Sequence, residues 1–354
     1  MCGIAGCYKM GTTPIREWQL IMLANQLEYR GNDATGFALM DTDGVISIFK
    51  HDDPAWKVTA SNDFRDFMRK YLTPKVRIAL VHTRKYTKGV PFHNQNNHPI
   101  YAGHGAIIHN GMVTNDDALF DVNKDLEGFK RSCETDSDAL RAILDNHGRI
   151  DKKLITEMGL VNGTAAVAAI HPATPDKLLL LRDSNPLILG ATADMLMFAS
   201  DKTAIHKALK PWVKVHNIPM QVHAPNISFV PMPNESGWII GPKGFEEHEV
   251  FKSNGQRRQG NLKYTPILNY HDRRADQKKE ADRLDAPPVR ILSHTHRVRV
   301  ENATMPDWVI CPNAKCNKHL ALSGDDKMLA GLALLKCGEC NTNLGGAIPA
   351  GRIN

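Results

Sequence analysis

The residue of this sequence whose type and position first suggest catalysis is the cysteine at position 2. Removal of Met1 would leave a cysteine whose thiol and free α-amine belong to the same residue. An α-amine ordinarily has a pKa of about 7.7–8.0, so it can act as the general base for a neighbouring nucleophile near neutral pH. A cysteine at the second position carries little information by itself. Whether Cys2 is a nucleophile or an incidental terminal residue therefore depends on whether the sequence also contains the other groups that a nucleophilic reaction needs.

Five short polar motifs follow Cys2 in a fixed order. They are YRGNDATG at 29–36, HTRKYTKG at 82–89, NHP at 97–99, HNG at 109–111 and ETD at 134–136. Each motif is weak alone, but the ordered series resembles the class II (N-terminal cysteine) glutamine amidotransferase domain. The closest likeness is to the glutaminase half of glucosamine-6-phosphate synthase, and it runs from Cys2 through Asp201.

That resemblance implies a particular fold and reaction. The fold is a four-layer α/β/β/α Ntn-hydrolase sandwich of the α+β class. The reaction is attack of the Cys2 thiolate on the side-chain amide of L-glutamine, giving a thioester and then glutamate and ammonia, with no cofactor for catalysis. From the residues alone, short strands interspersed with helices indicate a layered α/β or α+β domain, because periodicity does not choose the topology.

The tetrahedral oxyanion of such a reaction needs hydrogen-bond donors that are already in place. Asn110 offers a side-chain amide and Gly111 a backbone N–H, and glycine lets the chain approach a substrate closely. An isolated Asn-Gly pair is more typical of a type I′ hairpin turn. The apolar stretch before it and the other motifs favour the oxyanion interpretation. The resemblance makes Arg30 an organiser beside the nucleophile and Asp33 a part of the loop structure.

Glutamine must also be recognised by its amino-acid end. Arg84 can hold an α-carboxylate in a bidentate pair, which a lysine cannot reproduce. The resemblance assigns the α-ammonium to Asp136 and a pocket-shaping role to Thr87. The alternatives are a surface arginine and a helix-capping aspartate. The sequence departs from the family pattern at Lys85, where tryptophan is expected, and at Lys88, where histidine is usual.

Four of the seven cysteines suggest a metal site near the C-terminus. Their CxxxxC and CxxC pairs are separated by 20 residues, close to the pattern of a four-cysteine zinc ribbon, with His319 as a competing ligand. We predict a structural Zn²⁺ ion there, and ordinary buried thiols at Cys7 and Cys133. A histidine group earlier in the chain lacks ligand spacing with carboxylates, so structural roles are expected for it. The predicted zinc ligands are Cys311, Cys316, Cys337 and Cys340, and the histidines are His93, His98, His104 and His109.

Length and composition limit the domain organisation. The chain has 354 residues, 42% hydrophobic and 23% charged, which excludes disorder throughout and fits two domains or one large domain with an appendage. We expect the amidotransferase domain at 2–241, a basic polar linker or arm at 242–305 and the zinc ribbon at 306–346. The composition of the arm favours a solvated linker over a nucleic-acid-binding segment, and a net charge of +6 proves no nucleic-acid partner.

Hydrophobic periodicity and turn residues predict the elements of the first domain. Thr13 and Pro14 are expected to begin a helix that extends to Leu27. The segments 36–40 and 45–49 flank a DTDG turn and predict a β-hairpin. Further strands are expected at 76–82, 106–109, 165–170, 178–181, 187–189 and 195–198, and helices at 136–146 and 202–209.

The region after residue 241 is too short and too polar for the sugar-isomerase domains of the synthase. We therefore expect a stand-alone glutaminase subunit whose ammonia is used by an acceptor enzyme on another chain. The rivals are an inactive amidotransferase-like scaffold and an Ntn hydrolase of another amide. The first rival is disfavoured because a scaffold does not need all five of the site residues, Cys2, Arg84, Asn110, Gly111 and Asp136. The second is disfavoured because the Arg84/Asp136 pair recognises the head group of a free α-amino acid. Without a signal peptide or an apolar run of about 18 residues, a cytoplasmic protein with no membrane partner is expected.

Overall fold

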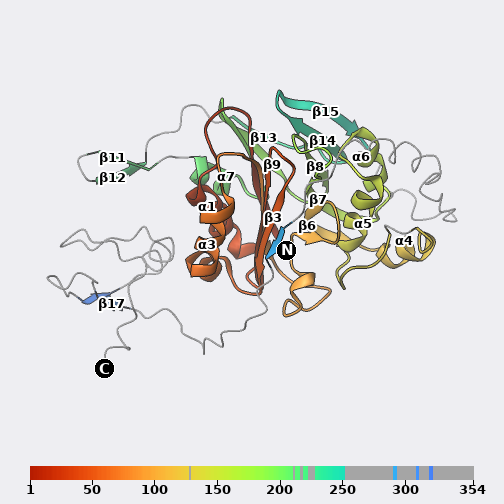
Figure 1. The fold of residues 1–354 in the computed structure, drawn as a ribbon, viewed down its shortest axis with the longest axis horizontal. Coiled ribbons are helices and arrows are strands. Elements are labelled where there is room, and N and C mark those ends of the chain that lie inside the picture. Colours follow the sequence, from red (N-terminus) through yellow and green to blue (C-terminus); the bar gives the residue numbers. More distant parts are fainter. Residues whose placement is uncertain are drawn as a thin grey trace.

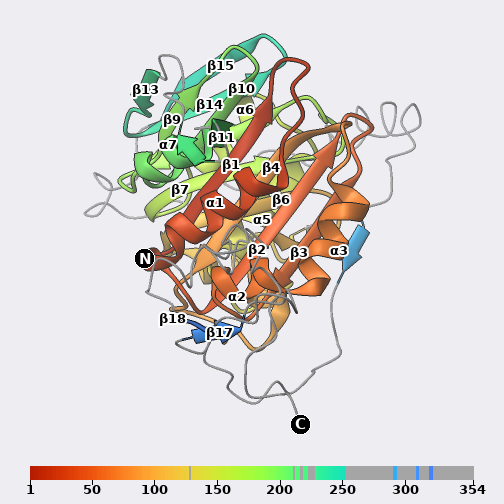
Figure 2. The ribbon, with the colours of Figure 1, turned by 90° about the vertical axis from the view of Figure 1, so that its left-hand side faces the viewer.

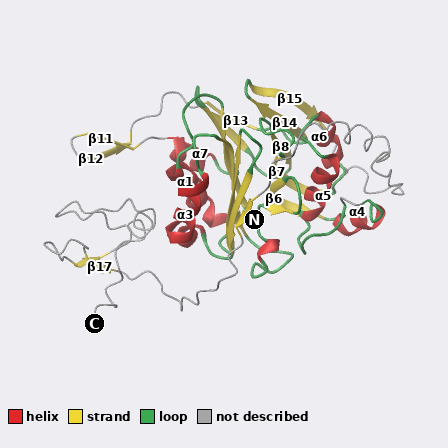
Figure 3. Cartoon of the chain, in the orientation of Figure 1, coloured by secondary structure: helices red, strands yellow, loops and turns green. Residues whose placement is uncertain are grey.

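Two β-sheets packed face to face form the centre of the molecule, and helices cover the outer face of each (Figure 1 and Figure 3). The computed structural model describes residues 1–126, 129–209, 212–215, 218–221, 228–251, 290–292, 308–310 and 319–321. Within these residues, neighbouring strands run antiparallel in both sheets, except for one parallel pair formed by β3 and β16. This mixed architecture of two antiparallel sheets agrees with the expected α+β class. None of the described helices is long and apolar enough to cross a membrane.

The first sheet has eight strands, and β1 lies near its centre. In spatial order they are β13 (Ser228–Pro231), β9 (Ile188–Ala191), β10 (Met195–Ala199), β1 (Gly3–Lys9), β4 (Val76–Arg84), β2 (Ala34–Asp41), β3 (Ile46–His51) and β16 (Arg290–Leu292). Figure 2 shows helices in front of this sheet. The helices of this layer are α1 (Glu17–Leu27), α2 (Ala55–Ala60), α3 (Asn62–Tyr71) and α7 (Lys202–Leu209).

The second sheet has six strands. In spatial order they are β15 (Gly244–Val250), β14 (Ser236–Gly241), β8 (Leu178–Asp183), β7 (Gly163–Ile170), β6 (Ala106–Val113) and β5 (Ile100–Tyr101). Its outer layer consists of α4 (Asp116–Val122), α5 (Asp138–His147) and α6 (Lys152–Met158). The remaining described elements are two short strand pairs, β11 (Trp212–Val215) with β12 (Ile218–Gln221) and β17 (Trp308–Ile310) with β18 (His319–Ala321), and two 3₁₀ turns at Glu28–Arg30 and Asn94–Asn96.

Alternation along β1 decides which way its side chains point. Ile4 and Tyr8 lie in the core between the two sheets, whereas Ala5 and Cys7 lie in the core under the helices. Successive side chains of a strand point to opposite faces, so residues two apart share a face. Cys2, which immediately precedes β1, therefore continues the row of Ile4 on the inner face.

The same alternation applies to β4. Ile78 and Leu80 lie in the core between the sheets, so His82 and Arg84 follow them on the inner face. In the antiparallel register of β1 with β4, Ile4 pairs with His82. Cys2 and Arg84 are thus brought to the same end of the same face.

Most of the expected elements are present. The predicted hairpin is formed by β2 and β3, paired from Thr35–His51 to Met40–Ile46, and α7 has the expected bounds. The helix expected at 136–146 is α5, which begins at Asp138 and ends beside Gly148 in the left-handed region, at φ 85°. The second sheet continues past residue 241 through β15, and Phe251 packs into the core beneath α6.

The prediction for the start of the first helix is wrong. α1 begins at Glu17 with Arg16 in the N-cap position, not at Thr13 and Pro14. The Thr13 hydroxyl instead donates to a carboxylate oxygen of Asp194 at 2.6 Å. A Thr-Pro pair is a helix-start signal only where no other acceptor competes for the threonine hydroxyl. Here the competing acceptor is Asp194, which lies 181 residues away in the sequence.

Candidate active site

Cys2 is half-buried, and the backbone of Lys85 contacts its thiol. The Lys85 N–H donates to Sγ at 3.4 Å, and the Lys85 carbonyl oxygen lies 3.4 Å from the same sulfur. Arg30, the predicted organiser, donates from Nε to the Cys2 carbonyl at 3.0 Å. Burial raises the pKa of the Cys2 thiol; the Lys85 N–H and the Arg84 guanidinium lower it, and the Asp136 carboxylate raises it further. The thiol thus lies within electrostatic reach of a cation and of a carboxylate.

Arg84 ends β4 with its guanidinium among neutral acceptors. Nη1 donates to Oδ1 of Asn97 at 2.8 Å. Nη2 donates to the carbonyl oxygens of Lys88 at 2.8 Å and Gly89 at 2.6 Å. Arg84 is 3% exposed, burial lowers its pKa, and it forms no ion pair with a carboxylate of the described residues. Because a guanidinium has five N–H donors, Nε and one hydrogen of Nη1 remain for an anionic ligand.

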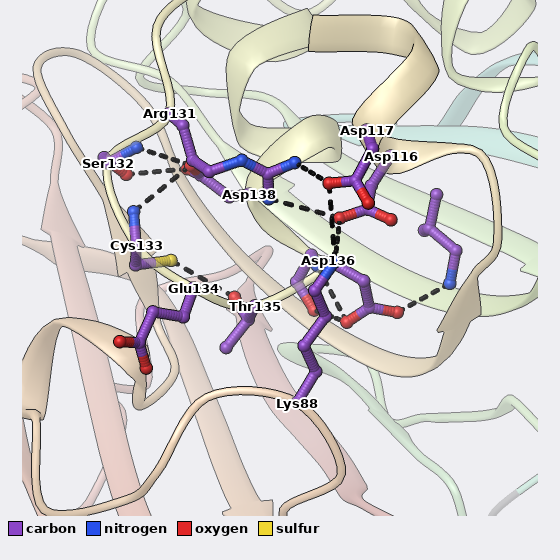
Figure 4. A network of polar contacts seen from close by, with 12 residues as sticks. Lys88, Asp116, Asp117, Arg131, Ser132, Cys133, Glu134, Thr135, Asp136 and Asp138 are labelled. Atoms are coloured by element: carbon purple, nitrogen blue, oxygen red, sulfur yellow. Dashed lines mark hydrogen bonds and ion pairs between the residues drawn. The ribbon is translucent and has the colours of Figure 1, made fainter.

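Asp136 lies just before α5, and both of its carboxylate oxygens accept backbone hydrogen bonds (Figure 4). Oδ2 accepts from the N–H of Val113 at 2.6 Å, and Oδ1 accepts from the N–H of Ser137 at 2.9 Å. The N-cap position of α5 belongs to Ser137, so Asp136 does not occupy it. Since Val113 ends β6, these contacts anchor the carboxylate on the strand that carries Asn110.

Asn110 and Gly111 lie inside β6, paired with β7, and not in a hairpin turn. Asn110 is 1% exposed, and its Nδ2 has no hydrogen-bond partner within the described residues, while its backbone carbonyl accepts from Asn185 Nδ2 at 2.9 Å. Gly111 has a φ of 157°, and a Cβ there would lie 1.9 Å from the carbonyl oxygen of Thr164. An unpaired buried donor is costly, so Nδ2 is a group that a ligand oxygen would satisfy.

A contact between the two sheets brings these groups together. Nε2 of His82, on β4, lies 3.1 Å from the carbonyl oxygen of His109, on β6. His82 pairs with Ile4, two residues after Cys2, and His109 directly precedes Asn110. The contact between His82 and His109 therefore joins the strand beside Cys2, the predicted nucleophile, to the strand that carries Asn110, the predicted oxyanion donor.

The loop after β4 carries the remaining predicted residue, Thr87, which is exposed. Charged side chains hold this loop on both sides of Thr87. Nζ of Lys85 lies 3.4 Å from the carboxylate of Asp33, and Nζ of Lys88 lies 2.6 Å from Oδ2 of Asp116. Figure 4 shows the second of these contacts beside Asp136. The two lysines that depart from the family pattern therefore have carboxylate partners in this chain.

Two residues next to the site were missed as functional candidates. Asn97, whose motif was recognised without a role, orients the guanidinium described above. Nζ of Lys50 donates to the carbonyl oxygens of Asn97 at 2.7 Å and Pro99 at 3.1 Å. A signal for Lys50 existed in the sequence, because it follows Ile46 and Ile48 at a spacing of two and so falls on the buried face of a strand.

No group of histidines, cysteines and carboxylates in the described part of the chain is suited to hold a metal ion. His98 stacks on His82 with ring centroids 4.1 Å apart, and burial lowers the pKa of His82 to about 3. Nδ1 of His109 lies 2.8 Å from the hydroxyl of Ser137. His82 and His109 therefore hydrogen-bond inside the fold, whereas His98 packs against His82 by ring stacking. The predicted zinc ligands lie outside the described residues: Cys311, Cys316, Cys337 and Cys340.

Comparison with curated proteins finds relatives that contain a similar stretch. The chain is 30% identical over 212 residues to glutamine–fructose-6-phosphate aminotransferase (isomerizing) from Francisella tularensis, covering 58% of this chain and 32% of that protein. A protein of the same name from Fusobacterium nucleatum is 31% identical over 213 residues, covering 58% of this chain and 33% of that protein. This chain is thus similar to a part of each of these two aminotransferases.

The chain spans about a third of the length of those relatives. Among solved structures, that of the allosteric regulatory enzyme of purine biosynthesis matches with a TM-score of 0.50 and 19% identity, over 72% of this chain and 50% of that one. At this identity the match concerns the fold alone. No protein-family model matches the chain.

Proposed function

We propose that this chain is a glutamine amidotransferase subunit that hydrolyses the side-chain amide of L-glutamine and supplies the ammonia to an acceptor enzyme on another chain. The observation that carries the proposal is the pair of opposite charges beside Cys2: Arg84 at the end of β4 and Asp136 anchored on β6. Their signs complement the carboxylate and the ammonium of a free α-amino acid. An amide that lacks this head group would leave both charges without partners, which disfavours its binding.

Substrate binding uses groups that the fold leaves available. The α-carboxylate of glutamine accepts from one of the two free N–H groups of Arg84, on Nε or on Nη1, whose other donors are engaged by protein acceptors. The α-ammonium donates to Asp136, whose two oxygens retain lone pairs beyond their backbone contacts. With both ends of the head group held, the side-chain amide extends toward Cys2.

The reaction begins with loss of the thiol proton. Burial raises the pKa of the Cys2 thiol, so it is protonated near neutral pH and needs a base. Once Met1 is removed, the α-amine of Cys2 takes this proton. The thiolate attacks the amide carbon, and the negative charge that develops on the amide oxygen is stabilised by Asn110 Nδ2 and the Gly111 N–H. Loss of one such donor typically raises the barrier by about 2.7–4 kcal/mol.

Collapse of the tetrahedral intermediate breaks the C–N bond. The leaving nitrogen takes the proton held by the α-amine and departs as ammonia, and a γ-glutamyl thioester with Cys2 remains. Water then attacks the thioester, with the same amine as base, giving glutamate and the free thiol. No step requires a cofactor.

Glutamate release from glutamine tests the proposal. Protein whose intact mass shows that Met1 is absent should produce glutamate, and the variant Cys2→Ala should not. Cys7→Ala is the matched control, because Cys7 is buried in the core under the helices and should leave turnover close to wild type. Absence of turnover by processed protein would favour the scaffold, and turnover of other amides without glutamine would favour a different hydrolase.

We further propose structural zinc for the C-terminal cysteine group, supported by the spacing of the cysteines alone. Metal analysis of the full chain should find about one equivalent of zinc, the stoichiometry of a four-thiolate site. A metal-free, fully folded chain would overturn this assignment. Neither the described residues nor the names of the relatives support a nucleic-acid partner.

A further inference from the structure

One row of paired residues crosses the inner face of the first sheet beneath the segment 97–99. Lys50 of β3 pairs with Gly36 of β2, and Gly36 pairs with His82 of β4. A Cβ at Gly36 would lie 2.0 Å from the carbonyl oxygen of His98, so the glycine lets this segment lie directly on β2. The segment is therefore flanked by the Lys50 side chain and by the His82 ring, which stacks on His98.

Lys50 holds the segment through its ammonium group. Nζ donates to the carbonyl oxygens of Asn97 at 2.7 Å and of Pro99 at 3.1 Å, and it forms no ion pair with a carboxylate in the described part of the chain. Burial lowers the pKa of Lys50 to about 8, and the Arg84 guanidinium lowers it as well. Lys50 is half-buried, and holding its ammonium among carbonyl oxygens without a counter-ion costs free energy, which a role in the site would account for.

Asn97 connects Lys50 to the candidate substrate site. Its backbone carbonyl accepts from Lys50, while its side-chain Oδ1 accepts from Nη1 of Arg84 at 2.8 Å. The Nδ2 group donates to the carbonyl of Pro91 at 2.7 Å and is 3.2 Å from Oδ1 of Asn94, which fixes the amide orientation. Asn97 is fully buried. The position of the Asn97 backbone therefore helps to set the position of the guanidinium, together with the carbonyls of Lys88 and Gly89.

We propose that Lys50 is a positioning residue for recognition of the substrate α-carboxylate, acting through Asn97 on Arg84. The inference rests on the proposed function and adds to it a residue that need not touch glutamine. Lys50 fixes the Asn97 carbonyl, Asn97 orients the arginine, and the lysine charge adds a second cation at the carboxylate end of the site. Without an anion, the two cations oppose each other. A bound carboxylate relieves that repulsion, so glutamine binding favours the protonated form of Lys50.

The groups that face Lys50 determine how this coupling depends on pH. Arg84 faces it from β4, neutral His98 from the segment 97–99, and Cys133 from the loop before α5. His51, its neighbour on β3, lies 3.0 Å from Asp53, whose hydrogen bond raises the pKa of that imidazole. None of these supplies a fixed negative charge to Lys50. As the pH rises through about 8, Lys50 becomes neutral and the KM for glutamine should rise.

The test compares the kinetics of wild type, Lys50→Met, Lys50→Arg and Lys75→Met, each with Met1 absent. Lys75 is an exposed lysine paired with Asp43 and serves as the matched control. Lys50→Met should raise the KM for glutamine by about tenfold, as expected for loss of a charged hydrogen-bond donor, with a change in kcat below about threefold. Lys50→Arg keeps its charge to a higher pH, so it should restore much of the affinity and flatten the rise in KM above pH 8.

Each outcome separates this inference from the function on which it rests. If wild type hydrolyses glutamine and Lys50→Met has the wild-type KM and pH profile, the positioning role is overturned and the function stands. An equal loss of kcat and affinity in both Lys50 variants would indicate a structural role only and also overturn the inference. If correctly processed wild type does not hydrolyse glutamine, the proposed function fails and this inference fails with it.

Discussion

Replacing Arg84 with lysine should weaken both the fold and substrate binding, by amounts that follow from its contacts. In the guanidinium, Nη1 donates a hydrogen bond to Asn97 Oδ1, and Nη2 donates to the carbonyl oxygens of Lys88 and Gly89. A lysine carries its donors on one nitrogen, so it cannot reach acceptors arranged around two. Asn97 Oδ1 is buried and would lose its donor, which costs about 1–3 kcal/mol of folding free energy. The two loop carbonyls are more accessible to water, so their loss adds less.

The effect on binding is separate from the effect on stability. Loss of a charge-assisted hydrogen bond costs about 1.5–3 kcal/mol, which corresponds to a fall of about 10- to 150-fold in kcat/KM for glutamine. The loss should appear mainly in KM, because the carboxylate is held equally in the ground state and in the transition state. Urea unfolding and steady-state glutaminase kinetics measure the two effects on the same preparation.

Arg69→Lys is the matched control for Arg84→Lys. Arg69 is 77% exposed and pairs at 2.9 Å with Asp66, which is 67% exposed. Exposed ion pairs contribute little, so this variant should stay within about 0.5 kcal/mol of wild-type stability and keep wild-type kinetics. An Arg84→Lys protein with the stability and KM of the control would refute the assignment of the guanidinium to the carboxylate.

Three further predictions concern other parts of the domain. Asp138→Ala leaves the buried Arg141 without its 2.8 Å partner and should cost about 3 kcal/mol in urea unfolding, whereas a loss below about 1 kcal/mol would contradict the importance of this pair. The carboxylate partners of His147, among them Asp151 at 2.8 Å, raise the pKa of the imidazole. Wild type should therefore be more stable than His147→Gln, with the full difference in unfolding free energy present below about pH 6.5. This difference should disappear as the pH rises through the raised pKa of His147 in the folded state, and a difference that does not change with pH would contradict the prediction. Gly111→Ala forces a Cβ to 1.9 Å from a β7 carbonyl oxygen, so its glutamine kcat/KM should fall by about 100-fold or more, and unchanged kinetics would contradict an oxyanion role.

The hairpin of β2 and β3 was predictable because its signals are local. Its turn residues and alternating apolar positions lie within one short stretch of sequence, and the two strands pair from Thr35–His51 to Met40–Ile46. The groups of the candidate site were selected by a resemblance across several motifs. Their proximity depends on two sheets coming together, as at the contact of His82 with the His109 carbonyl, and no local pattern contains that information.

Other features depend on distant partners and escaped prediction for that reason. The Thr13 hydroxyl binds Asp194 instead of capping a helix, and α1 starts three residues after the expected first-turn proline, Pro14. Lys50 could be placed on a buried strand face from its spacing, but its carbonyl partners arrive from the segment 97–99. Gly36 permits that approach, and a glycine inside a predicted strand gives no indication of what lies on it.

Covalent labelling by a diazoketone analogue of glutamine tests the central claim most directly. Such a compound carries the α-amino-acid head of glutamine and a carbon that alkylates the attacking thiolate. Peptide mass analysis of the treated full chain should find the adduct on a peptide that begins with Cys2, and excess glutamine should protect it. An adduct formed equally on chains that retain Met1, or placed on Cys7 or Cys133 while Cys2 stays unmodified, would contradict a terminal cysteine activated by its own amine.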